Sequence, residues 1–276
     1  MEIFGYTFFQ SALLGCLLAS LLCDFVGTYI VTRRLVFISG GITHASFGGI
    51  GLGIYYGINP ILSALVFAVA SAFGVQWMTT NGKVREDSAI AMFWTLGMSI
   101  GIIFSFLTPG VVTDISSYIF GNVLTITSMD IGLLAVLTII TALLFIFFGR
   151  TIMLVAFDAE YARSLHVPVK AIEYVMMMMI AMTVVSTLRM VGIVLAISML
   201  TIPQMTANAI TRNFRMMIPL SAIFALIYSI TGLIASYWLN VPSGACIIFV
   251  SILFYGVVKA IKHAIDGFKY IQLDNQ

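Results

Sequence analysis

Long apolar stretches alternate with short polar connections along almost the whole chain. About 20 consecutive apolar residues cross a bilayer as a helix, and the backbone in lipid is satisfied only in helices or closed barrels. The stretches are too long for barrel strands. They predict an all-α integral membrane protein, a polytopic bundle of about nine (eight to nine) transmembrane helices in one domain, 1–276. The predicted spans are 8–31, 36–57, 60–79, 88–107, 131–148, 171–188, 192–210, 217–237 and 244–258.

The basic residues lie almost entirely on one side of these spans. Of the 13 Lys and Arg residues, only Arg189 falls on the opposite side. Short connections rich in Lys and Arg are retained in the cytoplasm. We therefore expect a multi-pass protein with its N-terminus outside and its C-terminus in the cytoplasm.

Composition agrees with a membrane protein. Hydrophobic residues make up 61% of the chain and charged residues only 9%, which is too little polar surface to cover a water-soluble protein of 276 residues. The net charge of +2 is a sum over two compartments and gives no indication of nucleic-acid binding. Membrane lipid is the expected surrounding.

Two connections are long enough to do more than turn the chain. The external one, 108–130, is only weakly polar, and its segment 118–122 predicts either a dip back into the protein or a short interfacial helix. The internal one, 149–170, predicts a short helix.

Asp158 is a suitable N-cap for this internal helix, and Pro168 is expected to stop it. Acidic residues at its start and basic residues near its end suit the helix dipole. Its apolar residues Tyr161 and Leu165 are one helical turn apart. The helix either rests on the membrane surface or docks a cytoplasmic partner, and the pattern leaves both interpretations open.

The second span has a small residue at every fourth position, so one helical face carries almost no side chains. Another helix backbone can approach this face closely. The face serves either helix packing alone or packing combined with a substrate pathway. Its residues are Gly41, Ala45, Gly49, Gly53 and Gly57.

Two ionisable residues, Asp24 and His44, lie well inside predicted spans. Each is nine or ten residues from the basic connection, about 13–15 Å along the helix axis, so they have the same depth. A carboxylate with an imidazole suits zinc, manganese or iron. An Asp–His hydrogen bond that holds two helices together explains the pair equally well. Glu173, at a span end, is expected to be solvated.

Motifs of common enzymes are absent from the sequence. There is no phosphate-binding glycine loop followed by Lys and Ser or Thr, no HExxH and no nucleophile elbow. We expect a transport subunit without enzymatic activity or a permanently bound cofactor. If ATP powers transport, another chain hydrolyses it.

Several segments in fixed order resemble the permease subunits of metal-ion ABC importers, and the resemblance runs over nearly the whole chain. These segments are Arg33-Arg34-Leu35-Val36-Phe37, His44-Ala45-Ser46, Asn59-Pro60, Tyr118-Ile119-Phe120-Gly121, and 191–207 with Pro203.

The resemblance implies a permease of the bacterial inner membrane that passes zinc, manganese or iron inward. It implies a second permease copy in a homodimer, cytoplasmic ATP-binding subunits, and an extracytoplasmic metal-binding protein. His44 is carried over as a metal ligand in the channel. The segment 157–168 is implied to couple the permease to ATP hydrolysis, through Asp158, Glu160, Tyr161, Ala162, Leu165 and His166.

Two positions depart from the family pattern. The family usually has Asp four residues before the channel His, where this chain has Gly40, and Gly in the coupling segment, where this chain has His166. Our hypothesis is that Asp24 supplies the missing carboxylate from the neighbouring helix. The turn at His166 is expected to differ in shape.

Two other classes of transporter stay open. A permease for an iron chelate or a corrinoid needs a wide polar or aromatic cavity. A stand-alone secondary transporter or channel needs no docking helix.

Overall fold

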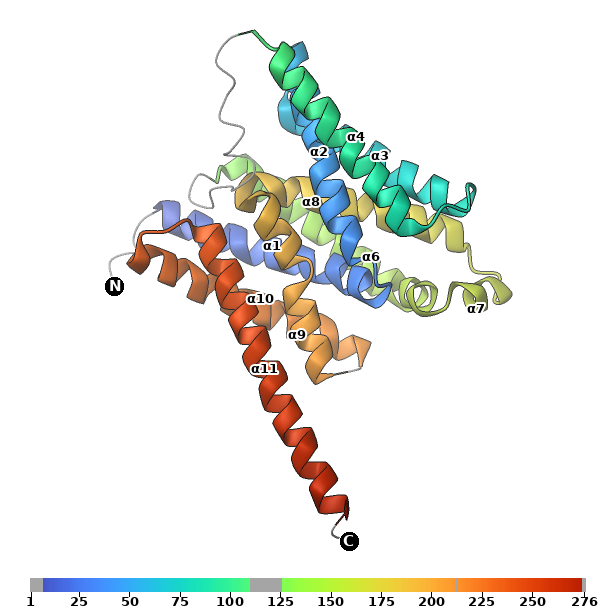
Figure 1. The fold of residues 1–276 in the computed structure, drawn as a ribbon, viewed down its shortest axis with the longest axis vertical. Helices are drawn as coiled ribbons and strands as arrows, with labels where there is room; N and C mark the ends of the chain where they lie inside the picture. Colours follow the sequence, from blue (N-terminus) through green and yellow to red (C-terminus); the bar gives the residue numbers. More distant parts are fainter. Residues whose placement is uncertain (1–6, 110–125, 212, 275–276) are drawn as a thin grey trace.

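The computed structural model describes residues 7–109, 126–211 and 213–274, and within these ranges the chain is helical between short connections (Figure 1). The predicted segment 118–122 lies outside the described residues. The helices are α1 (Thr7–Thr32), α2 (Val36–Tyr56), α3 (Pro60–Thr80), α4 (Glu86–Leu107), α6 (Ser128–Phe157), α7 (Ala159–Ser164), α8 (Val169–Met199), α9 (Ile202–Ile210), α10 (Phe214–Leu239) and α11 (Ser243–Asp274).

The prediction of a polytopic helical membrane protein is confirmed. Eight segments of the described chain are helical, long and apolar enough to cross a membrane. The remaining predicted span is α2, whose 21 residues extend about 31 Å, the thickness of the hydrocarbon core. Between its glycines and His44 the residues of α2 are mostly apolar.

One span boundary was predicted wrongly, because the span expected to end at 148 continues in α6 to Phe157. The two spans expected at 171–188 and 192–210 agree with the candidate spans Val169–Leu188 and Met190–Ile210. Between them the chain changes direction within α8, at Gly192. Gly192 has φ 74°, a conformation that glycine adopts at no steric cost, so one residue makes the turn. The return segment then breaks before α9.

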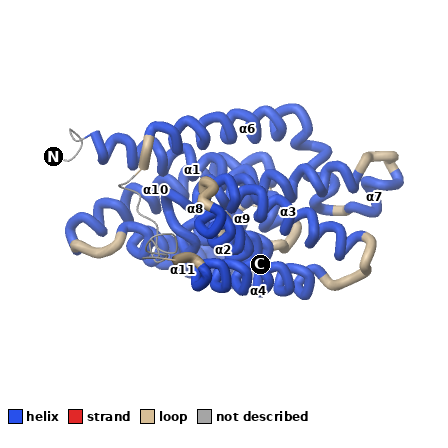
Figure 2. Tube along the Cα trace, turned by 90° about the horizontal axis from the view of Figure 1, so that it is seen from above, coloured by secondary structure: helices blue, strands red, loops and turns tan. Residues whose placement is uncertain are grey.

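The helices form two groups joined by α8. α2 packs between α3 and α4, and α1 packs against α6 and α10, while α8 contacts α1, α2, α3 and α6. α9 lies against α10 and α11. In Figures 1 and 2, α7 lies at the end of the molecule opposite the N-terminus.

Small residues bring α2 very close to both of its neighbours. A Cβ built on Gly49 would lie 2.6 Å from the Cα of Ala64 in α3, and one on Gly97 of α4 would lie 2.5 Å from the Cα of Ala45. No side chain fits at such distances. Gly57 serves a different purpose, because it ends α2 in the left-handed conformation, with φ 66°.

Candidate functional site

Asp24 is completely buried and links α1 to the start of α9. Its Oδ1 accepts a hydrogen bond from Nε2 of Gln204 at 2.9 Å, and the same amide nitrogen lies 3.2 Å from the carbonyl oxygen of Cys23. Ser221 of α10 approaches the carboxyl, but its hydroxyl donates to the carbonyl of Ile218. Oδ2 of Asp24 therefore has no hydrogen-bond partner among the described groups.

His44 lies against α4 and is half-buried. Its ring stacks on that of Trp94, with the ring centroids 4.5 Å apart and the planes inclined by 4°. Its Nδ1 is buried without a hydrogen-bond partner among the described groups. One turn earlier, a Cβ on Gly40 would meet only Ile197, at 3.7 Å, so the structure leaves room for a side chain there.

Within the described chain, no hydrogen bond or ion pair connects Asp24 with His44. Asp24 bonds to α9, whereas His44 stacks on α4. The described residues also contain no group of three or more His, Cys, Asp or Glu side chains placed to hold a metal ion. The metal-binding role of the two residues therefore stays a prediction.

The predicted coupling segment contains the short helix α7. Asp158 caps it, with Oδ1 accepting from the backbone N–H of Tyr161 at 2.8 Å, which confirms the predicted N-cap. The side chains of Tyr161 and Leu165 are 55% and 52% exposed, while Ala162 is buried against Val155. The helix thus anchors one face to the bundle and presents apolar side chains on the other.

α7 ends earlier than predicted, at Ser164 and not at Pro168. His166 has φ 60°, the N–H of Val167 donates to the carbonyl of Ala162, and the N–H of His166 donates to that of Arg163. These two bonds form a Schellman motif, in which the residue after the C-cap is left-handed and usually Gly. His166 therefore adopts the left-handed conformation that a glycine would adopt here. The expectation that the turn differs in shape was wrong.

One buried ionic cluster was missed at the sequence level. Glu173 of α8 is 6% exposed, not solvated as expected. Its Oε1 pairs with Nη2 of Arg33, which directly follows α1, at 2.9 Å, and its Oε2 accepts from Nε2 of Gln76 in α3 at 2.9 Å. Arg33 also donates to the carbonyl of Val155 in α6 at 3.3 Å. The cluster ties four helices together next to α7.

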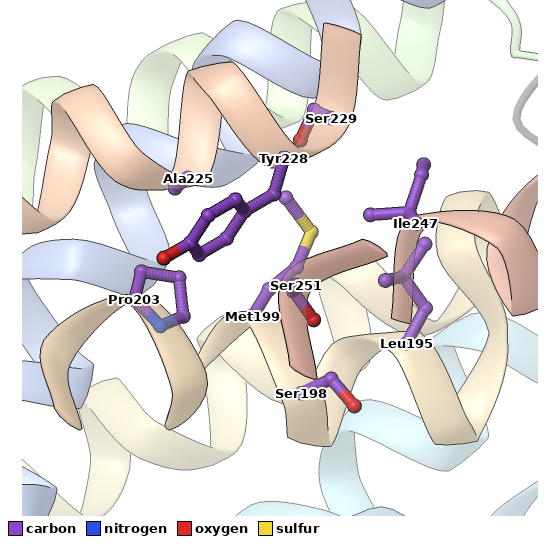
Figure 3. A pocket seen from close by; sticks show the side chains of 9 residues that line it. All are labelled: Leu195, Ser198, Met199, Pro203, Ala225, Tyr228, Ser229, Ile247 and Ser251. Carbon is purple, nitrogen blue, oxygen red and sulfur yellow. The ribbon is translucent and has the colours of Figure 1, made fainter. Parts of the chain in front are cut away.

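The space enclosed between the second half of α8 and α9, α10 and α11 is small (Figure 3). This cavity has a volume of about 10 Å³, and Tyr228 and Ser229 are among the residues that line it. A volume of this size accommodates about one water molecule.

Ionisable residues inside membrane-spanning helices are typical of transport proteins, and Asp24 and His44 are such residues here. The chain belongs to the ABC 3 transport family, whose model matches residues 5–262.

Named relatives and a solved structure agree with this family. An uncharacterized membrane protein of Synechocystis sp. is 36% identical over 257 residues, covering 93% of this chain and 92% of the relative. The manganese transport system membrane protein MntC of Halalkalibacterium halodurans is 30% identical, covering 91% and 86%. The structure of PsaBC from Streptococcus pneumoniae in complex with Fab matches with TM-score 0.82 and 25% identity, covering 93% and 92%.

Proposed function

We propose that this ABC permease imports a divalent transition-metal ion, with manganese, zinc and iron as the candidate ions. Support comes from its relationship to a manganese transport protein and from the imidazole of His44 inside a membrane span. ATP hydrolysis takes place in separate cytoplasmic subunits, and an extracytoplasmic protein delivers the metal. The membrane is the bacterial inner membrane, with the basic connections in the cytoplasm.

The proposed metal pathway rests on the position and the hydrogen bonding of His44. Trp94 holds the plane of the imidazole by stacking, and Nδ1 is buried with no hydrogen-bond partner among the described groups. A neutral imidazole nitrogen is a ligand for manganese, iron and zinc alike. One copy supplies few ligands, so the proposal includes a homodimer whose two-fold axis brings two His44 side chains to the path. The small-residue face of α2 packs against α3 and α4, so its part in the proposal is helix packing.

Asp24 has two possible roles in this scheme. As a ligand it supplies the carboxylate missing at Gly40 through Oδ2, the oxygen that has no hydrogen-bond partner among the described groups. As a structural group it holds α1 to the start of α9. The two roles predict different effects of removing the charge of Asp24: loss of uptake for a ligand, and loss of stability for a structural group.

His44→Ala is expected to abolish uptake of radioactive manganese in proteoliposomes while the assembled complex keeps its thermal midpoint. His263→Ala, a replacement of an exposed histidine, is the matched control and should transport normally. Uptake at the control level in His44→Ala would refute the metal pathway.

Asp24→Asn should abolish uptake at unchanged stability if Asp24 is a ligand. If it is structural, Asp24→Asn and Gln204→Leu should both lower the thermal midpoint and retain uptake.

The coupling role of α7 rests on its exposed apolar face. Replacing Tyr161 and Leu165 by Asp should release the ATP-binding subunit during purification and leave the permease inserted. The conservative pair Tyr161→Phe and Leu165→Met should keep the subunit. Retention by the Asp variant, with transport intact, would leave α7 as a helix that only rests on the membrane.

The orientation is tested by single cysteines in a cysteine-free background. An impermeant thiol reagent added outside should label positions 59 and 241 and leave positions 83 and 213 unlabelled. The reverse pattern would overturn the topology.

A further inference from the structure

A large groove separates α6 from α10 at the end of the bundle that carries the basic connections. Its volume is about 610 Å³. Its polar lining includes Arg150 and Asn213, and its apolar lining includes Phe145, Ile146 and Ile218. The described lining contains no acidic residue, so its charge is positive.

The depth of the groove follows from helix geometry. Arg150 comes 22 positions after Ser128, the first residue of α6. This separation corresponds to about 33 Å along the axis, the thickness of the hydrocarbon core. With Ser128 at one interface, Arg150 lies at the level of the lipid headgroups on the other. Ile146 and Phe145 lie about 6 and 7.5 Å deeper along α6, and Ile218 lies about 6 Å along α10 from its first residue, Phe214.

The groove is therefore polar and basic at headgroup depth and apolar at acyl-chain depth. Ile146 is 72% exposed, and Phe147 and Phe148 next to it are also exposed in the single chain. A water-soluble subunit does not reach this depth, whereas lipids and a second permease copy do. The positive charge at headgroup depth favours an anionic lipid as the occupant.

We propose that this groove binds an anionic phospholipid. The phosphate pairs with the guanidinium of Arg150, and one acyl chain lies along Phe145, Ile146 and Ile218. Basic pockets between transmembrane helices on the cytoplasmic side suit anionic headgroups, because anionic lipids are concentrated in that leaflet. The proposal rests on the groove and on its membrane setting, and does not depend on the transported metal.

Gly149 provides a way to block the groove without removing its charge. It lines the groove, and a Cβ built on it has no neighbour within 4 Å. Gly149→Leu therefore introduces a side chain into open space. Gly132 of the same helix is equally open but does not line the groove, so Gly132→Leu is its matched control. For the charge, Arg150→Gln is matched by Lys83→Gln, which alters an exposed basic residue at the same end.

The experiment uses the full-length permease complex in nanodiscs of phosphatidylcholine with increasing phosphatidylglycerol. After mild extraction, native mass spectrometry counts the retained lipids, and the thermal midpoint is measured at each composition. Wild type, Gly132→Leu and Lys83→Gln should retain phosphatidylglycerol and gain stability from it. Arg150→Gln should bind it about five-fold more weakly, the change expected for one basic residue at a membrane surface. Gly149→Leu should lose it.

Three results would overturn the proposal. One is equal retention of phosphatidylcholine and phosphatidylglycerol by wild type. Another is unchanged phosphatidylglycerol binding in both Arg150→Gln and Gly149→Leu. The third is displacement of the lipid's effect by millimolar inorganic phosphate, which would mean that the site recognises a free anion.

Discussion

Removing the charge of Glu173 should destabilise the permease strongly. The carboxylate is satisfied on both sides, by Arg33 at Oε1 and by Gln76 at Oε2, and the side chains of Arg33 and Glu173 are only 18% and 7% exposed. Breaking a buried ion pair costs about 3–5 kcal/mol, because the remaining charge is left without a partner. Solvent reaches part of Arg33, so Glu173→Met should cost about 3 kcal/mol, the lower end of that range.

The partner variant Arg33→Met should cost a similar amount, and the double variant Arg33→Met/Glu173→Met far less than the sum of the two. Apolar residues of similar size replace a buried pair at little cost. With single costs of about 3 kcal/mol each and a double cost of about 1 kcal/mol, the expected coupling free energy is about 5 kcal/mol, measured by reversible unfolding of the purified permease in mixed micelles.

An exposed ion pair provides the control for this cycle. Arg85 and Asp87 are 3.2 Å apart with side chains 84% and 69% exposed. Asp87→Asn should leave the unfolding curve unchanged, since exposed pairs contribute little. A coupling free energy below about 0.5 kcal/mol for Arg33 and Glu173 would show that the buried cluster does not act as a unit.

Three further variants test other parts of the structure. His166→Gly should stabilise the α7 cap by about 0.5–1 kcal/mol, because a left-handed conformation strains a residue with a Cβ; a lower thermal midpoint would contradict this. Gly97→Leu should prevent the close approach of α2 and α4 and abolish the folded permease in size-exclusion chromatography, whereas Gly132→Leu should behave as wild type. Gly40→Asp places a carboxylate one turn from His44, where an added Cβ meets only Ile197, at 3.7 Å. Its thermal midpoint should rise with added manganese more than that of wild type, and an equal response would argue against a metal path at this face.

The features predicted correctly from sequence depend on local properties. A membrane span requires a length of apolar chain, and α3, α4 and α10 each lie close to their predicted ranges. The N-cap of α7 is also local, since Asp158 binds the N–H three residues ahead.

The features that were missed depend on helices far apart in the sequence. Glu173 and Arg33 are 140 positions apart, and Gln204 and Asp24 are 180 apart. No spacing rule connects such pairs, because their contact depends on how the bundle assembles.

The composition of α2 has a consequence for how the protein enters the membrane. Isolated spans partition into lipid according to their own hydrophobicity, and α2 is apolar along most of its length. Its glycines gain from contact with the backbones of α3 and α4, which are synthesised later. We therefore expect α2 to enter the bilayer early but to reach its final packing only when the helices that follow it are in place. In a nascent chain truncated before α3, cysteines on the glycine face of α2 should react with a membrane-permeant thiol reagent, and in the full chain α3 and α4 should protect them.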